Sequence, residues 1–188
     1  MRVDAARKRE QVVAAAGDEL ADLAVAARNG EAVRLSLDKV AARARVGVAT
    51  LYRHFPTREA LLEAVYRQEL TRLCEAAPGL AAESPADKAL LAWMHRYLDF
   101  VDSKRAMGID LRAMVASGAV TQSDTRARLT TAVEPFLAAG TAAGTLRGDV
   151  PPGDVVAAMA GAVIAAAPEQ QREQTERLLA LLIDGLRP

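Results

Sequence analysis

Apolar residues recur at steps of three and four through most of the chain, which is the pattern of amphipathic helices. The first such stripe predicts a helix over about residues 4–28, ended by Asn29-Gly30. It is formed by Val12, Val13, Ala16, Leu20, Leu23 and Ala27. No strand-like alternation outlasts a few residues, so the pattern predicts an all-α protein.

Two short helices joined by a tight turn follow the first helix. Ser36 is a good N-cap for a second helix that ends near residue 44. Residues 45–47 form the turn, and a third helix over residues 48–55 is stopped by Pro56. Two short helices with a three-residue turn predict a helix-turn-helix, with small and apolar residues where the helices meet.

The rest of the chain predicts further helices. Thr57 caps a fourth helix that ends at Pro78-Gly79. Later helices are predicted over about residues 85–105, 106–116, 121–143, 153–167 and 169–186. Pro135 predicts a kink in the long helix that Gly144 ends. We expect a first domain over residues 1–58 and a C-terminal helical bundle over residues 59–188.

Composition narrows the function classes. Half of the residues are apolar, which is enough for a core, but only 4% are aromatic. The single cysteine, two histidines, absence of a glycine-rich phosphate loop and absence of metal-ligand spacing argue against an enzyme, a metal or a cofactor. The sequence shows no signal segment and no membrane span, so we expect a cytoplasmic protein.

The net charge of zero hides an asymmetry. Residues 1–60 hold 11 Lys/Arg and 8 Asp/Glu, whereas residues 61–188 hold 13 and 16. The stretch 39–58 has five cations and no carboxylate: Lys39, Arg43, Arg45, Arg53 and Arg58. Such a block can meet a polyanion, and the alternative is a solvated charged face.

The run VATLYRHFPTREALLEAV at residues 48–65 resembles the signature of TetR-family repressors. The matching residues are Leu51, Tyr52, His54, Phe55, Thr57, Arg58, Glu59 and Leu62. SLDKVAARARVGV (36–48) fits the family's second helix and turn, and AGTLRGDVPP (143–152) is similar to the approach to its dimerisation helices. The chain departs from the family at Arg45, where glycine is usual and arginine costs about 1 kcal/mol in a left-handed turn. The segment 24–35 is also longer than usual.

The resemblance implies a DNA-contacting surface on the second and third helices. Its residues are Ser36, Arg45, Val48, Ala49, Thr50, Tyr52, Arg53, His54 and Arg58. Tyr52, His54 and Arg58 would contact phosphates, and Arg53 is the candidate for a guanine contact. The alternatives are core packing for Tyr52, a helix-end hydrogen bond for His54, surface charge for Arg58 and a phosphate contact for Arg53.

The resemblance also implies a pocket and a dimer in the C-terminal domain. Candidate pocket residues are Trp93, Met94, Tyr97, Met107, Met114, Phe136 and Met159, although each taken singly is more readily explained as ordinary core. Candidate dimer residues are Val155, Met159, Ala162, Leu178, Leu179, Leu182 and Ile183. The implied function is a homodimeric repressor that binds a palindromic operator in double-stranded DNA and is released by a small-molecule inducer. The alternative is a constitutive DNA-binding protein without an inducer.

Overall fold

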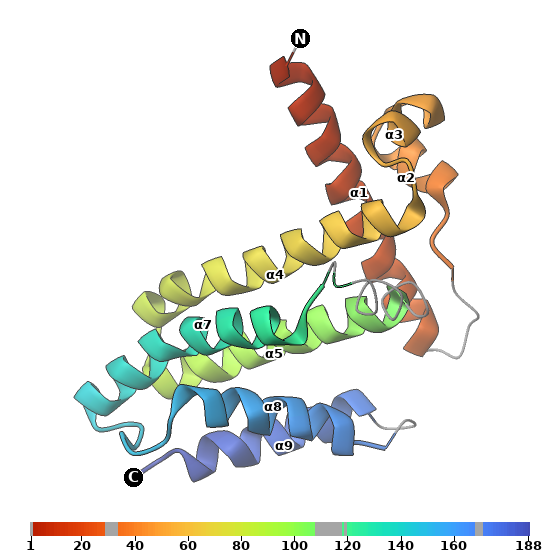
Figure 1. Cartoon of the computed structure of the whole chain (residues 1–188). Helices are drawn as coiled ribbons and strands as arrows, with labels where there is room; N and C mark the ends of the chain where they lie inside the picture. Colours follow the sequence, from red (N-terminus) through yellow and green to blue (C-terminus); the bar gives the residue numbers. More distant parts are fainter. Residues whose placement is uncertain (1, 29–33, 108–117, 119, 168–170) are drawn as a thin grey trace. The chain divides into compact units, whose positions relative to one another are not determined.

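The computed structural model describes residues 2–28, 34–107, 118, 120–167 and 171–188 (Figure 1). Its helices are α1 (Arg2–Arg28), α2 (Leu37–Arg43), α3 (Val48–His54), α4 (Arg58–Glu83), α5 (Ala86–Met107), α7 (Gln122–Ala143), α8 (Pro152–Ala165) and α9 (Gln171–Gly185). All regular elements in this part of the chain are helical, which confirms the all-α prediction. The helix predicted over about residues 106–116 lies largely outside the described residues. None of the described helices is long and apolar enough to cross a lipid bilayer.

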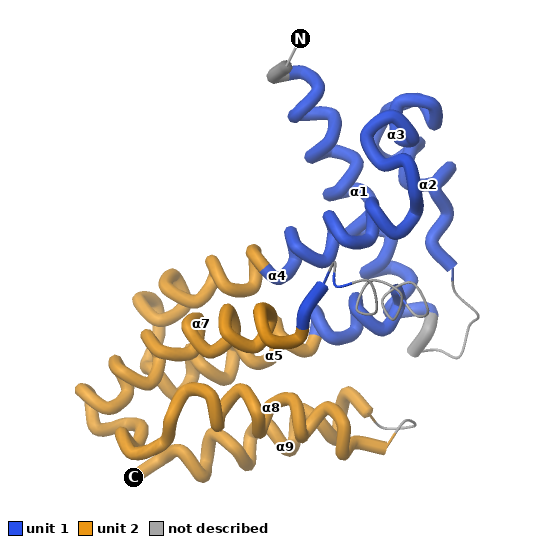
Figure 2. The backbone as a smooth tube through the Cα atoms, in the orientation of Figure 1, with its two compact units in different colours: residues 1–70, 99–121 blue, residues 71–98, 122–188 orange. Residues whose placement is uncertain are grey.

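The chain forms two compact units (Figure 2). Unit 1 comprises residues 1–70 and 99–121, and unit 2 comprises residues 71–98 and 122–188. Helices α4 and α5 therefore each contribute residues to both units. The functional boundary expected between residues 58 and 59 stays a prediction.

The core of unit 1 holds the helix-turn-helix against α1. The predicted stripe of α1 is buried at Val12, Val13, Ala16 and Leu20. Helix α1 contacts both α2 and α3, so the two short helices are supported from one side by a long one. This support matters because a seven-residue helix is too short to be stable alone in water.

The core of unit 2 is built around two aromatic rings. The ring centroids of Trp93 and Phe136 lie 6.0 Å apart, and both side chains are fully buried. The indole Nε1 of Trp93 donates a hydrogen bond of 2.8 Å to the carbonyl of Leu73, which satisfies its polar atom. Helix α8 packs against both α7 and α9.

The two internal prolines do not end their helices. The prediction that the fourth helix ends at Pro78-Gly79 is wrong, because α4 continues to Glu83. Proline removes one intrahelical hydrogen bond, a cost that the packing of neighbours such as Ala77, which is 1% exposed, offsets. Helix α7 runs through Pro135 to Ala143, and Gly144 follows with a positive φ of 68°, which confirms the predicted end.

Candidate nucleic-acid interface

Local signals define α2 and the turn after it. The backbone N–H of Lys39 donates to the Ser36 hydroxyl at 3.4 Å, so Ser36 is the N-cap, as predicted. After α2, Arg45 N–H donates to the Ala42 carbonyl at 3.1 Å and Val46 N–H donates to the Ala41 carbonyl at 3.0 Å. This pair of bonds is the Schellman motif, whose central residue adopts the left-handed conformation. Arg45 occupies that position with a φ of 54°.

Helix α3 has a buried face and an exposed face. Leu51 is completely buried and Phe55, its C-cap, is 2% exposed, so both anchor the helix in unit 1 as predicted. On the other face Tyr52 is 46% exposed and Val48 is 39% exposed. Ala49 and Arg53 are also exposed, while Thr50 and His54 are half-buried. The side chains that could reach DNA therefore face outward, while Leu51 and Phe55 are buried and hold the helix in place.

Two polar side chains on the exposed face are linked to each other. A guanidinium N–H of Arg53 donates to the Thr50 hydroxyl at 2.8 Å, one helical turn away. Arginine has five N–H donors, so this bond orients the guanidinium and leaves it further donors for a base edge or a phosphate.

Arg58, at the start of α4, is tied to the backbone before α2. Its Nη1 donates to the carbonyl of Leu35 at 2.9 Å in a partly buried contact. Thr57 caps α4 by accepting from the N–H of Ala60 at 3.1 Å, which confirms the predicted cap. Arg58 therefore helps to fix the backbone just before the start of α2. Sequence reasoning missed this role because Leu35 lies 23 residues away.

Acidic residues of α1 neutralise part of the basic block. Arg43 lies 2.7 Å from Asp22 Oδ2 and 3.7 Å from Glu19 Oε2, and the hydrogen bond to Asp22 is the main cause that raises the pKa of Arg43. Lys39 lies 3.8 Å from the buried Glu19. Two of the five cations between residues 39 and 58 thus have carboxylate partners inside unit 1.

Helix α1 also places a cation at the end of α3. The guanidinium of Arg9 lies 5.0 Å from the centre of the Phe55 ring, which is cation–π geometry. Arg9 itself is exposed, so its charge stays close to solvent while its guanidinium lies over a buried ring.

The arrangement has the features of a helix-turn-helix that reads DNA. A short, supported helix exposes a phenol, a guanidinium and small side chains. An α-helix of this size fits the major groove of B-DNA. The fold and this surface together define a helix-turn-helix DNA-binding protein.

Comparisons with known proteins identify the family. The profile described as "Bacterial regulatory proteins, tetR family" matches residues 32–65. The profile described as "Transcriptional regulator SbtR-like, C-terminal domain" matches residues 85–188, more than half of the chain. The chain belongs to the TetR family and is a DNA-binding transcriptional regulator. Regulators of this family are not enzymes.

Solved structures agree with this identification. A TetR transcriptional regulator from Streptomyces coelicolor is 43% identical, with 96% of this chain and 98% of that chain covered and a TM-score of 0.78. A TetR regulator from Mycobacterium vanbaalenii is 29% identical, with coverage of 100% and 99% and a TM-score of 0.69. A putative family member from Rhodococcus, 20% identical over 97% and 100% of the chains, shares the fold with a TM-score of 0.59. A search of curated proteins gave no match.

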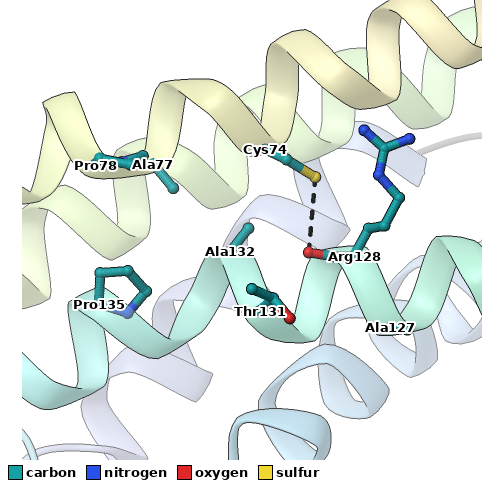
Figure 3. Close-up of a pocket in the computed structure, with 8 residues that line it drawn as sticks. All are labelled: Cys74, Ala77, Pro78, Ala127, Arg128, Thr131, Ala132 and Pro135. Carbon is teal, nitrogen blue, oxygen red and sulfur yellow. Dashed lines mark hydrogen bonds between the residues drawn. The ribbon is translucent and has the colours of Figure 1, made fainter.

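The residues expected to line a ligand pocket are buried where the structure describes them. Trp93, Met94, Tyr97, Phe136 and Met159 are at most 8% exposed in unit 2, and Met107 is buried in unit 1. Met114 lies outside the described residues. A cleft of about 460 Å³ in unit 2 is lined by a different set (Figure 3). The lining residues are Cys74, Ala77, Pro78, Ala127, Arg128, Thr131, Ala132 and Pro135.

The residues expected at a dimer interface divide into two groups. Val155, Met159, Leu179 and Ile183 are at most 2% exposed within the single chain, so they offer no surface to a partner. Ala162, Leu178 and Leu182 are half-buried. The most exposed large apolar side chains of α8 and α9 are instead Ile164, at 83%, and Leu181, at 65%. The periodicity identified the apolar stripe but not which part of it the chain itself covers.

Proposed function

We propose that this regulator is a ligand-responsive repressor that binds a palindromic operator as a homodimer and is released by a small-molecule inducer. The observation that carries the proposal is the exposed face of α3, with Tyr52 and Arg53 outward over the buried anchors Leu51 and Phe55. Because the exposed side chains of this face are not needed for the core, the face supports a role in recognition.

The proposed contacts divide by chemistry. Ser36, Arg45, Tyr52, His54 and Arg58 are donors at the rim of the surface and suit phosphates, which fix the register on DNA. Val48, Ala49, Thr50 and Arg53 lie along α3 and suit base edges. Val48 and Ala49 match thymine methyl groups, and Arg53 matches the two acceptors of guanine.

Operator binding is tested with the DNA that flanks the protein's own gene, by fluorescence anisotropy at several salt concentrations. Arg53→Gln is expected to weaken specific binding by about tenfold to a hundredfold, since a bidentate base contact contributes about 1–3 kcal/mol of discrimination. Arg96→Gln removes the same charge from an exposed position of α5 and is expected to change nothing. Failure to discriminate the flanking DNA from unrelated DNA at moderate salt would refute the proposal.

A dimer is proposed because one seven-residue recognition helix reads too few base pairs. Two copies about 34–36 Å apart reach successive major grooves on one face of the duplex. The exposed Ile164 and Leu181 support a subunit surface on α8 and α9, since large exposed apolar side chains mark interaction sites.

Analytical ultracentrifugation tests this subunit surface. Ile164→Glu is expected to shift the protein towards monomer and, with it, to lose palindrome binding. The control is Val25→Glu, which introduces the same charge at a half-exposed apolar residue of α1. Equal self-association of the two variants would exclude this surface.

The inducer distinguishes the proposal from a constitutive DNA-binding protein. The cleft of about 460 Å³ in unit 2 supports an inducer site, because small-molecule sites are typically about 300–1,000 Å³. Screening small molecules for release of bound operator tests this step. Operator binding that no compound weakens would favour the constitutive alternative.

A further inference from the structure

The cleft of unit 2 has apolar walls and one charged residue. Figure 3 shows that Cys74, Ala77 and Pro78 come from α4, and that residues from Ala127 to Pro135 come from α7. Of the eight lining residues, only Arg128 is charged. The walls therefore suit an apolar molecule, and Arg128 decides which charge that molecule carries.

Arg128 is held in place at one end of the cleft. Its Nη2 donates to the Thr71 hydroxyl at 2.8 Å in a partly buried contact, which uses one of its five donors. Its backbone carbonyl accepts from the Cys74 thiol at 3.7 Å (Figure 3). Burial is the main cause that raises the pKa of Cys74, so at neutral pH this thiol stays uncharged and does not neutralise the guanidinium. The cation thus remains available to an anion within the cleft.

Two prolines at the other end of the cleft change its hydrogen-bonding capacity. In a regular helix, the N–H of residues 78 and 135 would bond the carbonyls of Cys74 and Thr131. Pro78 and Pro135 have no N–H, so both carbonyls lose their helical donor. All four of these residues line the cleft. A ligand hydroxyl can replace the missing donors.

From these features we infer that the α4–α7 cleft binds an elongated apolar carboxylic acid with a hydroxyl group distant from the carboxylate. The carboxylate pairs with Arg128 in a charge-assisted, bidentate manner, and the hydroxyl donates to the carbonyls near the two prolines. Arg128 and Pro135 are separated by seven steps along α7, a rise of about 10 Å, which sets the approximate length of the ligand. The inference rests on the proposed function in taking this class of molecule as the inducer.

Three eight-carbon probes test the inference by titration calorimetry on the full chain: octanoate, octylamine and 8-hydroxyoctanoate. They share an apolar body and differ in the groups at their ends. Octanoate is expected to bind about tenfold more tightly than octylamine, because only the acid gains the charge-assisted pair with Arg128. 8-Hydroxyoctanoate is expected to bind more tightly than octanoate, because its hydroxyl meets the carbonyls.

Matched variants assign the two ends of the ligand. Arg128→Gln is expected to abolish the preference for acid over amine. Arg126→Gln, two residues away on α7 and outside the cleft, is expected to retain it. Pro135→Ala restores an N–H for the Thr131 carbonyl, so the advantage of the hydroxyl should shrink while octanoate binding persists. Circular dichroism verifies folding, and Ala127→Phe, at an exposed wall position, is a second variant that should block all three probes.

Each outcome has a distinct meaning. No octanoate binding up to its solubility limit, or equal affinity for octanoate and octylamine, overturns the inference. Persistence of the acid preference in Arg128→Gln also overturns it. Operator binding is measured on the same preparations. If the protein binds its operator but not the probes, only the cleft assignment fails. If it binds the probes but no operator, the proposed function fails instead.

Discussion

Replacement of Arg45 by glycine is expected to stabilise the protein and to lower its affinity for DNA. Arg45 is the one non-glycine residue with a positive φ, 54°, among the residues that the structure describes. The two hydrogen bonds of the Schellman motif, from Arg45 and Val46, fix this conformation at the turn of the helix-turn-helix. The backbone strain and the positive charge therefore lie on the same residue and can be separated by substitution.

The magnitude follows from two opposing effects. The left-handed conformation costs a residue with a Cβ about 1–2 kcal/mol. Glycine loses about 0.5–1 kcal/mol more conformational entropy on folding than a residue such as alanine. The difference predicts that Arg45→Gly is more stable than Arg45→Ala by about 0.5–1 kcal/mol, or about 1–4 °C in Tm for a chain of this size.

Urea unfolding at a fixed protein concentration measures the first effect, and comparison of the two variants cancels the loss of charge. DNA binding measures the second. If Arg45 contacts a phosphate, both variants reduce the slope of log affinity against log salt by about 1. Equal unfolding free energies of Arg45→Gly and Arg45→Ala would refute the strain argument, and an unchanged salt slope would refute the phosphate contact.

Three further predictions concern other contacts. Asp22→Asn removes the exposed ion pair between Asp22 and Arg43, so DNA affinity should rise several-fold with a steeper salt dependence, and a lower affinity in anisotropy titrations would contradict this. Arg9→Ala removes the contact with the Phe55 ring and should cost about 0.5–1 kcal/mol of unfolding free energy, and no coupling in a double-mutant cycle with Phe55→Leu would exclude the contact. Burial raises the pKa of Cys74 above its ordinary value of 9.0. The contribution of the uncharged thiol to stability is therefore complete below pH 9.0 and is lost as pH rises through the pKa of the folded protein. Urea unfolding between pH 7 and 10.5 should show a decline in the free energy of unfolding, and Cys74→Ser should reduce that decline.

Helix ends in unit 1 were predictable because their signals are local. The hydroxyl of Ser36 reaches an N–H three residues ahead, and that of Thr57 does the same. The buried and exposed faces of α3 follow from helical periodicity, which places Leu51 and Phe55 on one side. The end predicted at Pro78 was wrong because proline alters only one hydrogen bond, and packing along the rest of α4 decides whether the helix continues.

Side-chain roles that depend on distant partners were not predictable. The acids that pair with Arg43 lie on another helix, and the carbonyl that binds Arg58 precedes α2. Similarly, apolar periodicity marks Met159 and Ile183 as candidates for a pocket or an interface as readily as for the core. Only packing shows that the chain covers both side chains itself.

Local signals in the sequence predict the helices, the turn at Arg45 and the outward face of α3. These signals are capping, left-handed turns and helical periodicity, each of which acts over a few residues. Two features could not be predicted from local signals: which cations face solvent, and the contact of Cys74 with Arg128, 54 residues further along the chain. The physical reason is that a cleft or an ion pair between helices depends on how their surfaces pack, which no local pattern of residues specifies.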